Sequence, residues 1–249
     1  MVFRQLFEPL SSTYTYILGC EDSGKALLID GVMPTWQRDI GVIKQLGMTL
    51  AQTLDTHIHA DHITSAKTLK QETGSRIAHP SIDGLSCTDD PLEEGSPLKV
   101  GSIELHPLFT PGHTEGHHAY HVNDRVFTGD ALLIDGCGRT DFQGGDAAQL
   151  YRSIHDKLFS LDDETLVYPG HDYKGRWNSC IGQEKTRNPR LGGGKSESDF
   201  ITIMSELKLA YPKFIDYAVP GNQACGVCPE SLPEELKAYC EFMKESGQG

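Results

Sequence analysis

Four side chains that can bind metal fall within residues 57–62, in the run His57-Ile-His59-Ala-Asp61-His62. His57 and His59 are two positions apart, so their side chains point the same way if this segment is extended. We expect Asp61 and His62 at the start of a helix, where adjacent side chains diverge and can serve two neighbouring metal positions. Imidazole and carboxylate groups together suit zinc, iron or manganese. The segment therefore predicts a metal centre.

Three more candidates each follow a glycine at an expected strand end or tight turn. They are His113 in Thr-Pro-Gly-His, Asp130 in Thr-Gly-Asp and His171 in Tyr-Pro-Gly-His. A preceding glycine lets the backbone approach a crowded centre. An isolated histidine is more often a satisfied core or surface residue, but that alternative gives no reason for this spacing. We therefore predict that all seven side chains gather at one site.

Short strands with interleaved helices must position these side chains. The expected strands cover residues 13–18, 26–29, 50–54, 77–78, 103–109, 117–122, 125–127 and 166–168. The expected helices cover residues 36–46, 61–73 (ended by Gly74), 147–158, 200–209 and 234–244. This order indicates an α/β or α+β layered fold. We expect one domain over residues 1–249, with 192–249 as a C-terminal extension that starts at a run of three glycines.

The seven candidate ligands resemble those of the metallo-β-lactamase superfamily, over roughly residues 10–175. The resemblance implies an αββα sandwich with the metal centre at one edge. It implies two metal positions, with this distribution of ligands: His57, His59 and His113 at the first, Asp61, His62 and His171 at the second, and Asp130 between them.

The chemistry of these ligands allows two kinds of centre. Two metal ions bridged by a hydroxide would hydrolyse an ester or a thioester. One iron held by His57, His113 and Asp130 would instead form a two-histidine, one-carboxylate face. Such a face leaves open positions for oxygen and a sulfur substrate. The types of the ligands do not choose between these centres.

Segments outside the ligand set resemble the persulfide dioxygenases, the sulfur dioxygenases of mitochondria and many bacteria. These segments are Gly-Cys-Gly-Arg-Thr-Asp-Phe-Gln at 136–143, Asn-Pro-Arg-Leu at 188–191, and residues 215–226. The resemblance covers about residues 4–227. It implies that one Fe(II) per chain serves the oxidation of glutathione persulfide by O₂ to sulfite and glutathione, a step of sulfide catabolism.

In that family the iron would be held by His57, His113 and Asp130. The remaining four candidates, His59, Asp61, His62 and His171, would orient the ligands and bound water.

Glutathione carries two carboxylates, so its pocket should offer cations. Arg139 and Arg190 are our candidates, because a guanidinium group pairs with a carboxylate through two hydrogen bonds. Tyr173, two residues after His171, could donate a hydrogen bond to a substrate near the metal. For each arginine the alternative is a surface ion pair.

Two other functions stay open. A glyoxalase-II-like hydroxyacylglutathione thioester hydrolase with a dinuclear centre shares the seven ligands, but its larger helical C-terminal domain with basic groups is not visible in this sequence. A non-enzymatic iron or redox sensor would bind metal without turning over a thiol or thioester.

Composition narrows the partners. The 249 residues carry a formal net charge of −13, which disfavours nucleic-acid binding because an acidic surface repels phosphate. The sequence has no apolar run near the ~18 residues that a membrane helix needs, and no secretory or transit-like pattern at its start. We expect a cytoplasmic protein, with a processed protein of the mitochondrial matrix as the alternative. Family analogy implies a homodimer.

The seven cysteines lack the dense spacing of a disulfide framework and fit a reducing compartment. Cys225 and Cys228 form a Cys-x-x-Cys pair, for which we expect incidental thiols, with a redox pair or half a zinc site as alternatives. Cys137 is expected to be a small buried residue.

Overall fold

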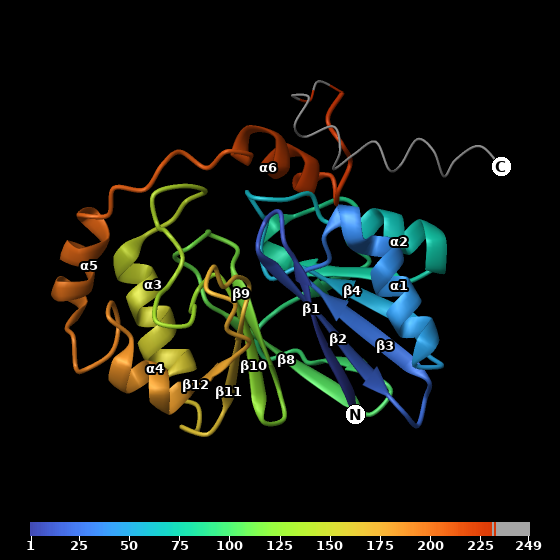
Figure 1. Ribbon diagram of the computed structural model, residues 1–249, viewed down its shortest axis with the longest axis horizontal. Coiled ribbons are helices and arrows are strands. Elements are labelled where there is room, and N and C mark those ends of the chain that lie inside the picture. Colours follow the sequence, from blue (N-terminus) through green and yellow to red (C-terminus); the bar gives the residue numbers. More distant parts are fainter. Residues whose placement is uncertain (231, 233–249) are drawn as a thin grey trace.

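Two six-stranded sheets pack against each other between two layers of helices in the computed structural model, which describes residues 1–230 and 232 (Figure 1). The first sheet has the order β1 (Val2–Glu8), β2 (Thr13–Cys20), β3 (Lys25–Ile29), β4 (Thr49–Leu54), β5 (Arg76–Pro80), β6 (Asp90–Leu92). The second has the order β12 (Ser179–Cys180), β11 (Leu166–Pro169), β10 (Arg125–Gly129), β9 (His118–Val122), β8 (Ile103–Phe109), β7 (Leu98–Val100). This architecture confirms the expected αββα sandwich.

Helices lie on both outer faces of the sandwich, and α6 lies across its top in Figure 1. Their bounds are α1 (Trp36–Gln45), α2 (Ala66–Thr73), α3 (Ala147–Ser153), α4 (Ile181–Arg187), α5 (Glu197–Ser205) and α6 (Ile215–Gln223). Short 3₁₀ turns lie at Met33–Thr35 and Ser81–Asp83, and a π-helical turn at Ile154–Leu158 continues α3. Figure 1 shows α1 and α2 on one side of the sandwich and α3, α4 and α5 on the other. Within the described residues, none of these helices is both long and apolar enough to cross a bilayer.

Strand β2 is an example of a strand that is buried on both faces. All eight of its residues are buried, since one face of the strand meets the second sheet and the other meets helices. Tyr16 and Leu18 join the core between the two sheets, and Ile17 joins the core beneath α1. Because the strand is covered on both faces, its buried positions do not alternate with exposed ones, and even the polar Thr13 and Thr15 are buried.

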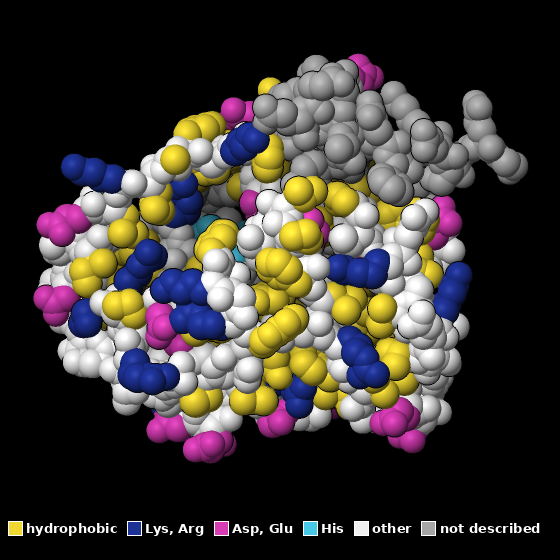
Figure 2. Space-filling model, viewed as in Figure 1, with side chains coloured by type: hydrophobic (Ala, Val, Ile, Leu, Met, Phe, Trp, Pro, Cys, Tyr) yellow, Lys and Arg dark blue, Asp and Glu magenta, His cyan; other side chains and the backbone are white. Residues whose placement is uncertain are grey.

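Strands β4, β10 and β11 each belong to a parallel pair and end at the same edge of the sandwich. Three of the candidate ligands lie just after these strand ends. β4 pairs parallel with β3, and β10 pairs parallel with β11. His57 follows the end of β4, Asp130 follows β10, and His171 follows β11. Carboxyl ends of parallel strands form the usual crevice for a site in an open sheet. In Figure 2 histidine side chains are visible inside a hollow on this face, beside Lys and Arg side chains.

Glycine is required before three of the ligands, and a Cβ on Gly112, before His113, would lie 2.3 Å from the Leu150 backbone nitrogen. Gly129 has a φ of +47°, and a Cβ there would lie 2.6 Å from His117 Nε2. A Cβ on Gly170 would lie 2.6 Å from Asp130 Oδ1. The close backbone approach expected from the sequence is therefore present.

The helix expected over residues 61–73 is shorter than expected. It begins at Ala66, so Asp61 and His62 lie in an irregular loop and not on a helix. The helix expected at 200–209 begins at Glu197, after a capping box formed by Ser196 and Asp199, and ends at Ser205. The helix expected at 234–244 lies outside the described residues. Six elements were not expected from the sequence, namely β1, β6, β7, β12, α4 and α6.

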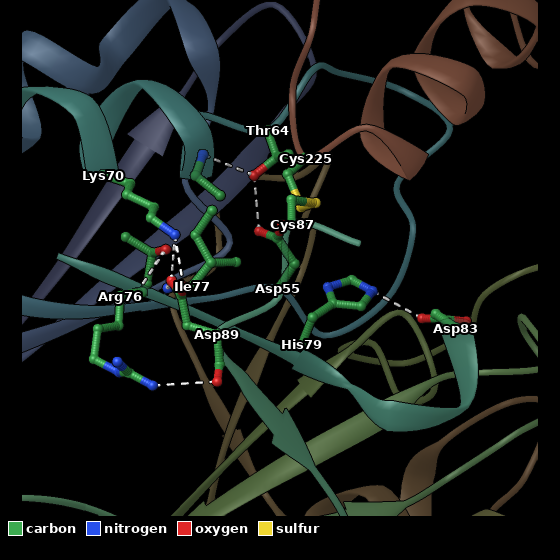
Figure 3. The surroundings of a disulfide bond; sticks show 12 residues. Asp55, Thr64, Lys70, Arg76, Ile77, His79, Asp83, Cys87, Asp89 and Cys225 are labelled. Atoms are coloured by element: carbon green, nitrogen blue, oxygen red, sulfur yellow. Dashed lines mark hydrogen bonds and ion pairs between the residues drawn. A yellow bond between two sulfur atoms is a disulfide. The ribbon is translucent and has the colours of Figure 1, made fainter. Parts of the chain in front are cut away.

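The expectation of free thiols is wrong for Cys225, which forms a disulfide with Cys87 across 138 residues of sequence (Figure 3). Cys225 is therefore not paired with Cys228 within the Cys-x-x-Cys motif. Spacing along the chain does not reveal such a pairing, because only the fold brings the two residues together. Cys137 is buried, as expected, and its thiol is free.

Candidate metal centre

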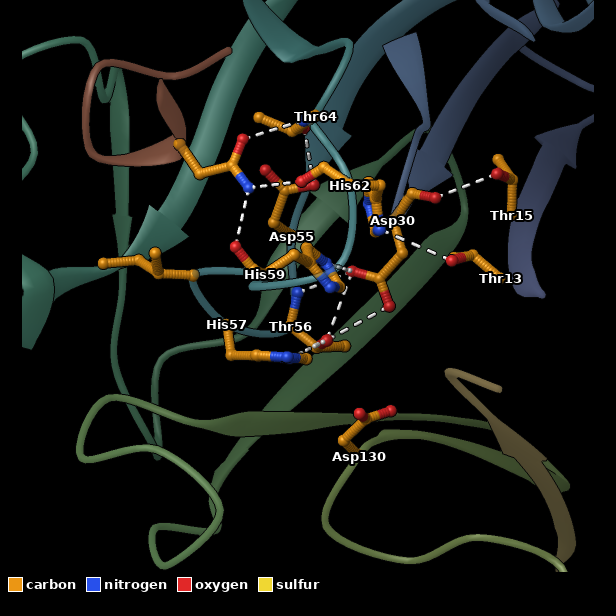
Figure 4. Close-up of polar contacts among 12 residues, drawn as sticks. Thr13, Thr15, Asp30, Asp55, Thr56, His57, His59, His62, Thr64 and Asp130 are labelled. Atoms are coloured by element: carbon orange, nitrogen blue, oxygen red, sulfur yellow. Dashed lines mark hydrogen bonds and ion pairs between the residues drawn. The ribbon is translucent and has the colours of Figure 1, made fainter. Parts of the chain in front are cut away.

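The loop between β4 and α2 carries four of the candidate ligands, and a buried carboxylate organises it (Figure 4). Asp30, directly after β3, is fully buried. Its Oδ1 accepts hydrogen bonds from the Thr56 backbone N–H at 2.7 Å and from His59 Nε2 at 3.1 Å. The Thr56 hydroxyl also lies 3.1 Å from Asp30 Oδ2 and 2.9 Å from His57 Nδ1. One side chain thus orients two histidines of the loop.

The predicted triad comes together at the base of the hollow. His57, His113 and Asp130 each offer a ligand atom, and these atoms lie within 4.8 Å of one another. His113 Nδ1 donates to the Arg139 carbonyl at 2.7 Å, which leaves Nε2 as an acceptor 3.7 Å from Asp130 Oδ2. The arrangement is that of a two-histidine, one-carboxylate face.

The other four candidates lie next to this triad. Ligand atoms of His59, Asp61 and His62 also lie within 4.8 Å of one another. His171 Nε2 lies 3.5 Å from Asp61 Oδ2 and 3.6 Å from Asp130 Oδ1, so His171 joins the two groups. All seven residues that the sequence singled out are therefore brought together.

The free atoms of this cluster fit a metal ion. Within the described part of the chain, His59 Nδ1, His62 Nε2 and Asp130 Oδ1 are buried and have no hydrogen-bond partner. A buried polar atom without a partner destabilises the protein by about 1–3 kcal/mol, so these atoms favour a bound ligand such as a metal ion. The second ring nitrogen of each histidine contacts an oxygen, namely Asp30 Oδ1 for His59 and Asp61 Oδ2 for His62. This is the usual arrangement behind histidine ligands.

The electrostatics of the cluster also favour a cation. Burial, together with the neighbouring His59 and His113, holds the pKa of His57 well below its ordinary value, so His57 offers a neutral imidazole. Burial would lower the pKa of His171 as well, but the carboxylates of Asp130 and Asp61 raise it. The two carboxylates thus favour positive charge beside His171, and a bound metal would supply that charge.

Two residues outside the seven candidate ligands, Asp30 and His117, support the site. Asp30 could have been noticed as the residue that ends the apolar run 26–29 before Gly31. His117 is buried beside His57, with ring centroids 5.0 Å apart. Its Nε2 accepts from the Asp130 backbone N–H at 3.2 Å, and its Nδ1 lies 2.9 Å from the Thr110 hydroxyl. Both ring nitrogens are engaged, so His117 supports Asp130 and is not a ligand.

A pocket of about 590 Å³ opens above the triad, and the three proposed substrate contacts line it. Arg139 forms two hydrogen bonds with Asp141, at 2.6 and 2.7 Å, and lies over the ring of Phe142. Arg190 donates to the Cys137 carbonyl at 2.8 Å. Tyr173 is 75% exposed. The pocket therefore carries both signs of charge, since Asp61, Asp130, Asp135 and Asp172 line it together with its arginines and lysines.

Comparisons with known proteins agree with this geometry. The family model of the metallo-β-lactamase superfamily matches residues 9–171. The mitochondrial persulfide dioxygenase ETHE1 of Homo sapiens is 45% identical over 230 residues, which are 91% of this chain and 89% of that protein. The crystal structure of ETHE1 from Myxococcus xanthus has a TM-score of 0.89 and 51% identity, over 91% of this chain and all of that one.

A hydrolase relative matches less of the chain. The hydroxyacylglutathione hydrolase of Cereibacter sphaeroides is 35% identical over 168 residues, which are 66% of this chain and 64% of that protein. The similarity to the dioxygenases therefore extends over segments that the hydrolase match does not include.

Proposed function

The chain belongs to the metallo-β-lactamase superfamily and, within it, to the persulfide dioxygenases, and we propose that it uses one Fe(II) per chain to oxidise glutathione persulfide with O₂ to sulfite and glutathione. The observation that carries this proposal is the face formed by His57, His113 and Asp130 at the base of a pocket. Two imidazoles and one carboxylate suit iron and leave open positions for O₂ and for the persulfide sulfur. The homodimer and the compartment stay predictions.

The protein positions the metal ligands and fixes which ring nitrogen of His113 carries the proton. The Arg139 carbonyl holds the proton of His113 on Nδ1, which keeps Nε2 available as a ligand. His117 accepts a hydrogen bond from the Asp130 backbone N–H, and the Thr110 hydroxyl contacts the other nitrogen of the His117 ring. These two contacts hold the Asp130 backbone in place. Fe(II), when bound, supplies the redox chemistry of the reaction. We propose that His59, Asp61, His62 and His171 orient these ligands and bound water.

Cationic side chains in the pocket offer partners to an anionic substrate, although the whole chain is acidic. The net charge of −13 disfavours the approach of glutathione persulfide, whose glutathione part carries two carboxylates. Five cationic side chains nevertheless line the pocket, namely Arg139, Lys174, Arg176, Arg190 and Lys213. Arg139 pairs with Asp141, and Arg176 pairs with Asp135 and Asp172. We propose that Arg139 and Arg190 pair with the substrate carboxylates and that Tyr173 donates a hydrogen bond near the metal.

Replacing Arg139 by alanine is expected to raise the KM for glutathione persulfide about tenfold with kcat nearly unchanged, because a charged hydrogen bond to the substrate is lost. Arg139 contacts the metal site through its backbone carbonyl, which alanine keeps. Initial rates of oxygen uptake at varied substrate concentration would measure both constants.

Arg152→Ala is a matched control, because Arg152 pairs with Glu197 on the surface and does not line the pocket. An Arg139→Ala variant with the KM of the parent protein would remove Arg139 from the substrate site.

Oxygen uptake tests the proposed function. The Fe(II)-loaded protein should consume O₂ when glutathione persulfide is added, and the sulfite formed should match the O₂ consumed in amount. An iron-loaded protein that consumes no O₂ but hydrolyses a glutathione thioester would instead favour a two-metal hydrolase. In that case the second ligand group, His59, Asp61, His62 and His171, would be a working metal position.

A further inference from the structure

Residues 55–65, between β4 and α2, are called the metal loop below. Asn222, in the last turn of α6, binds this loop through all the hydrogen-bonding groups of its side chain. Its Nδ2 donates to the backbone carbonyls of His59 at 2.9 Å and His62 at 2.8 Å. Its Oδ1 accepts from the Thr64 backbone N–H at 2.8 Å. Two of these three groups belong to candidate ligand residues that lie about 160 residues earlier in the chain.

The loop depends on these bonds because it has no regular structure of its own. Residues 58–63 lie outside any strand or helix, so their backbone groups need partners from elsewhere. Asn222 is only 3% exposed, and water does not easily replace it there. An amide is the side chain that offers two donors and an acceptor at one point. An aspartate of the same shape would lose both donors.

The chain around Asn222 is packed so closely on the loop that its position is fixed. Gly226 has a φ of +93°, and a Cβ there would lie 2.1 Å from the Thr64 carbonyl oxygen. A Cβ on Gly221 would lie 2.9 Å from Ile63 Cδ1. The Cys225 carbonyl accepts from the Lys67 backbone N–H at the start of α2.

A covalent tether completes this arrangement. Cys225, three residues after Asn222, is joined to Cys87 in the segment before β6 (Figure 3). Figure 3 shows the disulfide beside Thr64, whose hydroxyl donates to Asp55 at 3.0 Å. The tether joins the end of α6 to the part of the first sheet that carries the metal loop. It therefore limits the movement of Asn222 away from that loop.

We infer that Asn222 is a positioning residue for the metal centre, which sets the backbone of His59 and His62 and is held in place by the Cys87–Cys225 disulfide. Asn222 acts on His59 and His62 through their backbone carbonyls, to which its amide donates. The inference rests on the proposed metal centre and does not depend on the identity of the substrate.

The affinity for Fe(II) tests this inference. Asn222→Ala should weaken Fe(II) binding about tenfold, the lower end of the effect of residues that support metal ligands, because it acts on His59 and His62, which orient the ligands. Competition with a chelator under anaerobic conditions would give the dissociation constant. The electron paramagnetic resonance spectrum of the Fe(II)–nitric oxide adduct should also change in shape, which a loss of stability alone would not cause. Gln223→Ala is the matched control, because Gln223 is the adjacent amide and is exposed.

Further variants separate the contact from the tether. Asn222→Asp keeps the acceptor but not the donors, so it should bind Fe(II) as weakly as Asn222→Ala. Cys87→Ser keeps the contact but not the tether, so it should weaken binding by less than tenfold. If Asn222→Ala does not fold, Asn222→Ser answers the same question with one hydroxyl in place of the amide.

Folded Asn222 variants with the Fe(II) affinity and the nitrosyl spectrum of the parent protein would overturn the inference. A parent protein that binds Fe(II) but does not oxidise a persulfide would overturn the proposed function alone.

Discussion

Replacing Asp130 by alanine is expected to abolish iron retention and oxygen uptake together. Asp130 lies between the two ligand groups, with Oδ2 3.7 Å from His113 Nε2 and Oδ1 3.6 Å from His171 Nε2. Alanine removes the one carboxylate of the triad and leaves only two neutral imidazoles to hold the ion. We expect kcat/KM to fall at least about a thousandfold, which corresponds to about 4 kcal/mol of transition-state stabilisation. His57→Ala should have the same effect.

The measurement pairs iron content after dialysis with oxygen uptake on glutathione persulfide. Asp156→Ala is a suitable control, because Asp156 is exposed and does not line the pocket. Full activity in the Asp130 or the His57 variant would show that our assignment of ligands is wrong. Iron retained without activity would show that Asp130 is not needed to hold the iron and would give it a role in the reaction itself.

Replacing Asp30 by alanine should cost about 3–5 kcal/mol in the free energy of unfolding of the metal-free protein, the usual result of removing one partner of a buried charged pair. Asp30 is fully buried and accepts from the Thr56 backbone and from His59. Alanine leaves these donors without a partner in the interior. Denaturant unfolding, with the midpoint and slope compared between variants, would measure the loss.

Two controls accompany this prediction. Asp124→Ala removes an aspartate that is 63% exposed and paired with Arg125, so it should change stability by less than about 1 kcal/mol. Asp30→Asn keeps an acceptor for Thr56 and tolerates the positive φ of 53°, so it should lose less than Asp30→Ala. Equal stability of Asp30→Ala and the parent protein would contradict the role that we give to Asp30.

Much of the candidate site could be predicted because its ligands are set by local sequence. The alternation of His57 and His59 and the glycines before Asp130 and His171 are local patterns, and the structure places these residues at neighbouring strand ends. Local patterns also predicted β2, β3, β4 and α1 within a few residues, since burial on one or both faces determines which side chains these elements need.

Other features depend on residues far apart in the chain, and only the tertiary structure decided them. The segment 61–65 has a helical pattern, yet it forms a loop whose backbone is bound by Asn222 from α6. Spacing gave no sign that Cys87 and Cys225 form a disulfide. Arg139 was predicted from the charge of the substrate, but its pairing with Asp141 appears only in the fold. The sequence by itself determined which side chains can bind a metal, because that is a property of residue type and local spacing. Their orientation was decided by hydrogen bonds between distant segments, which form only when the two sheets and α6 have packed.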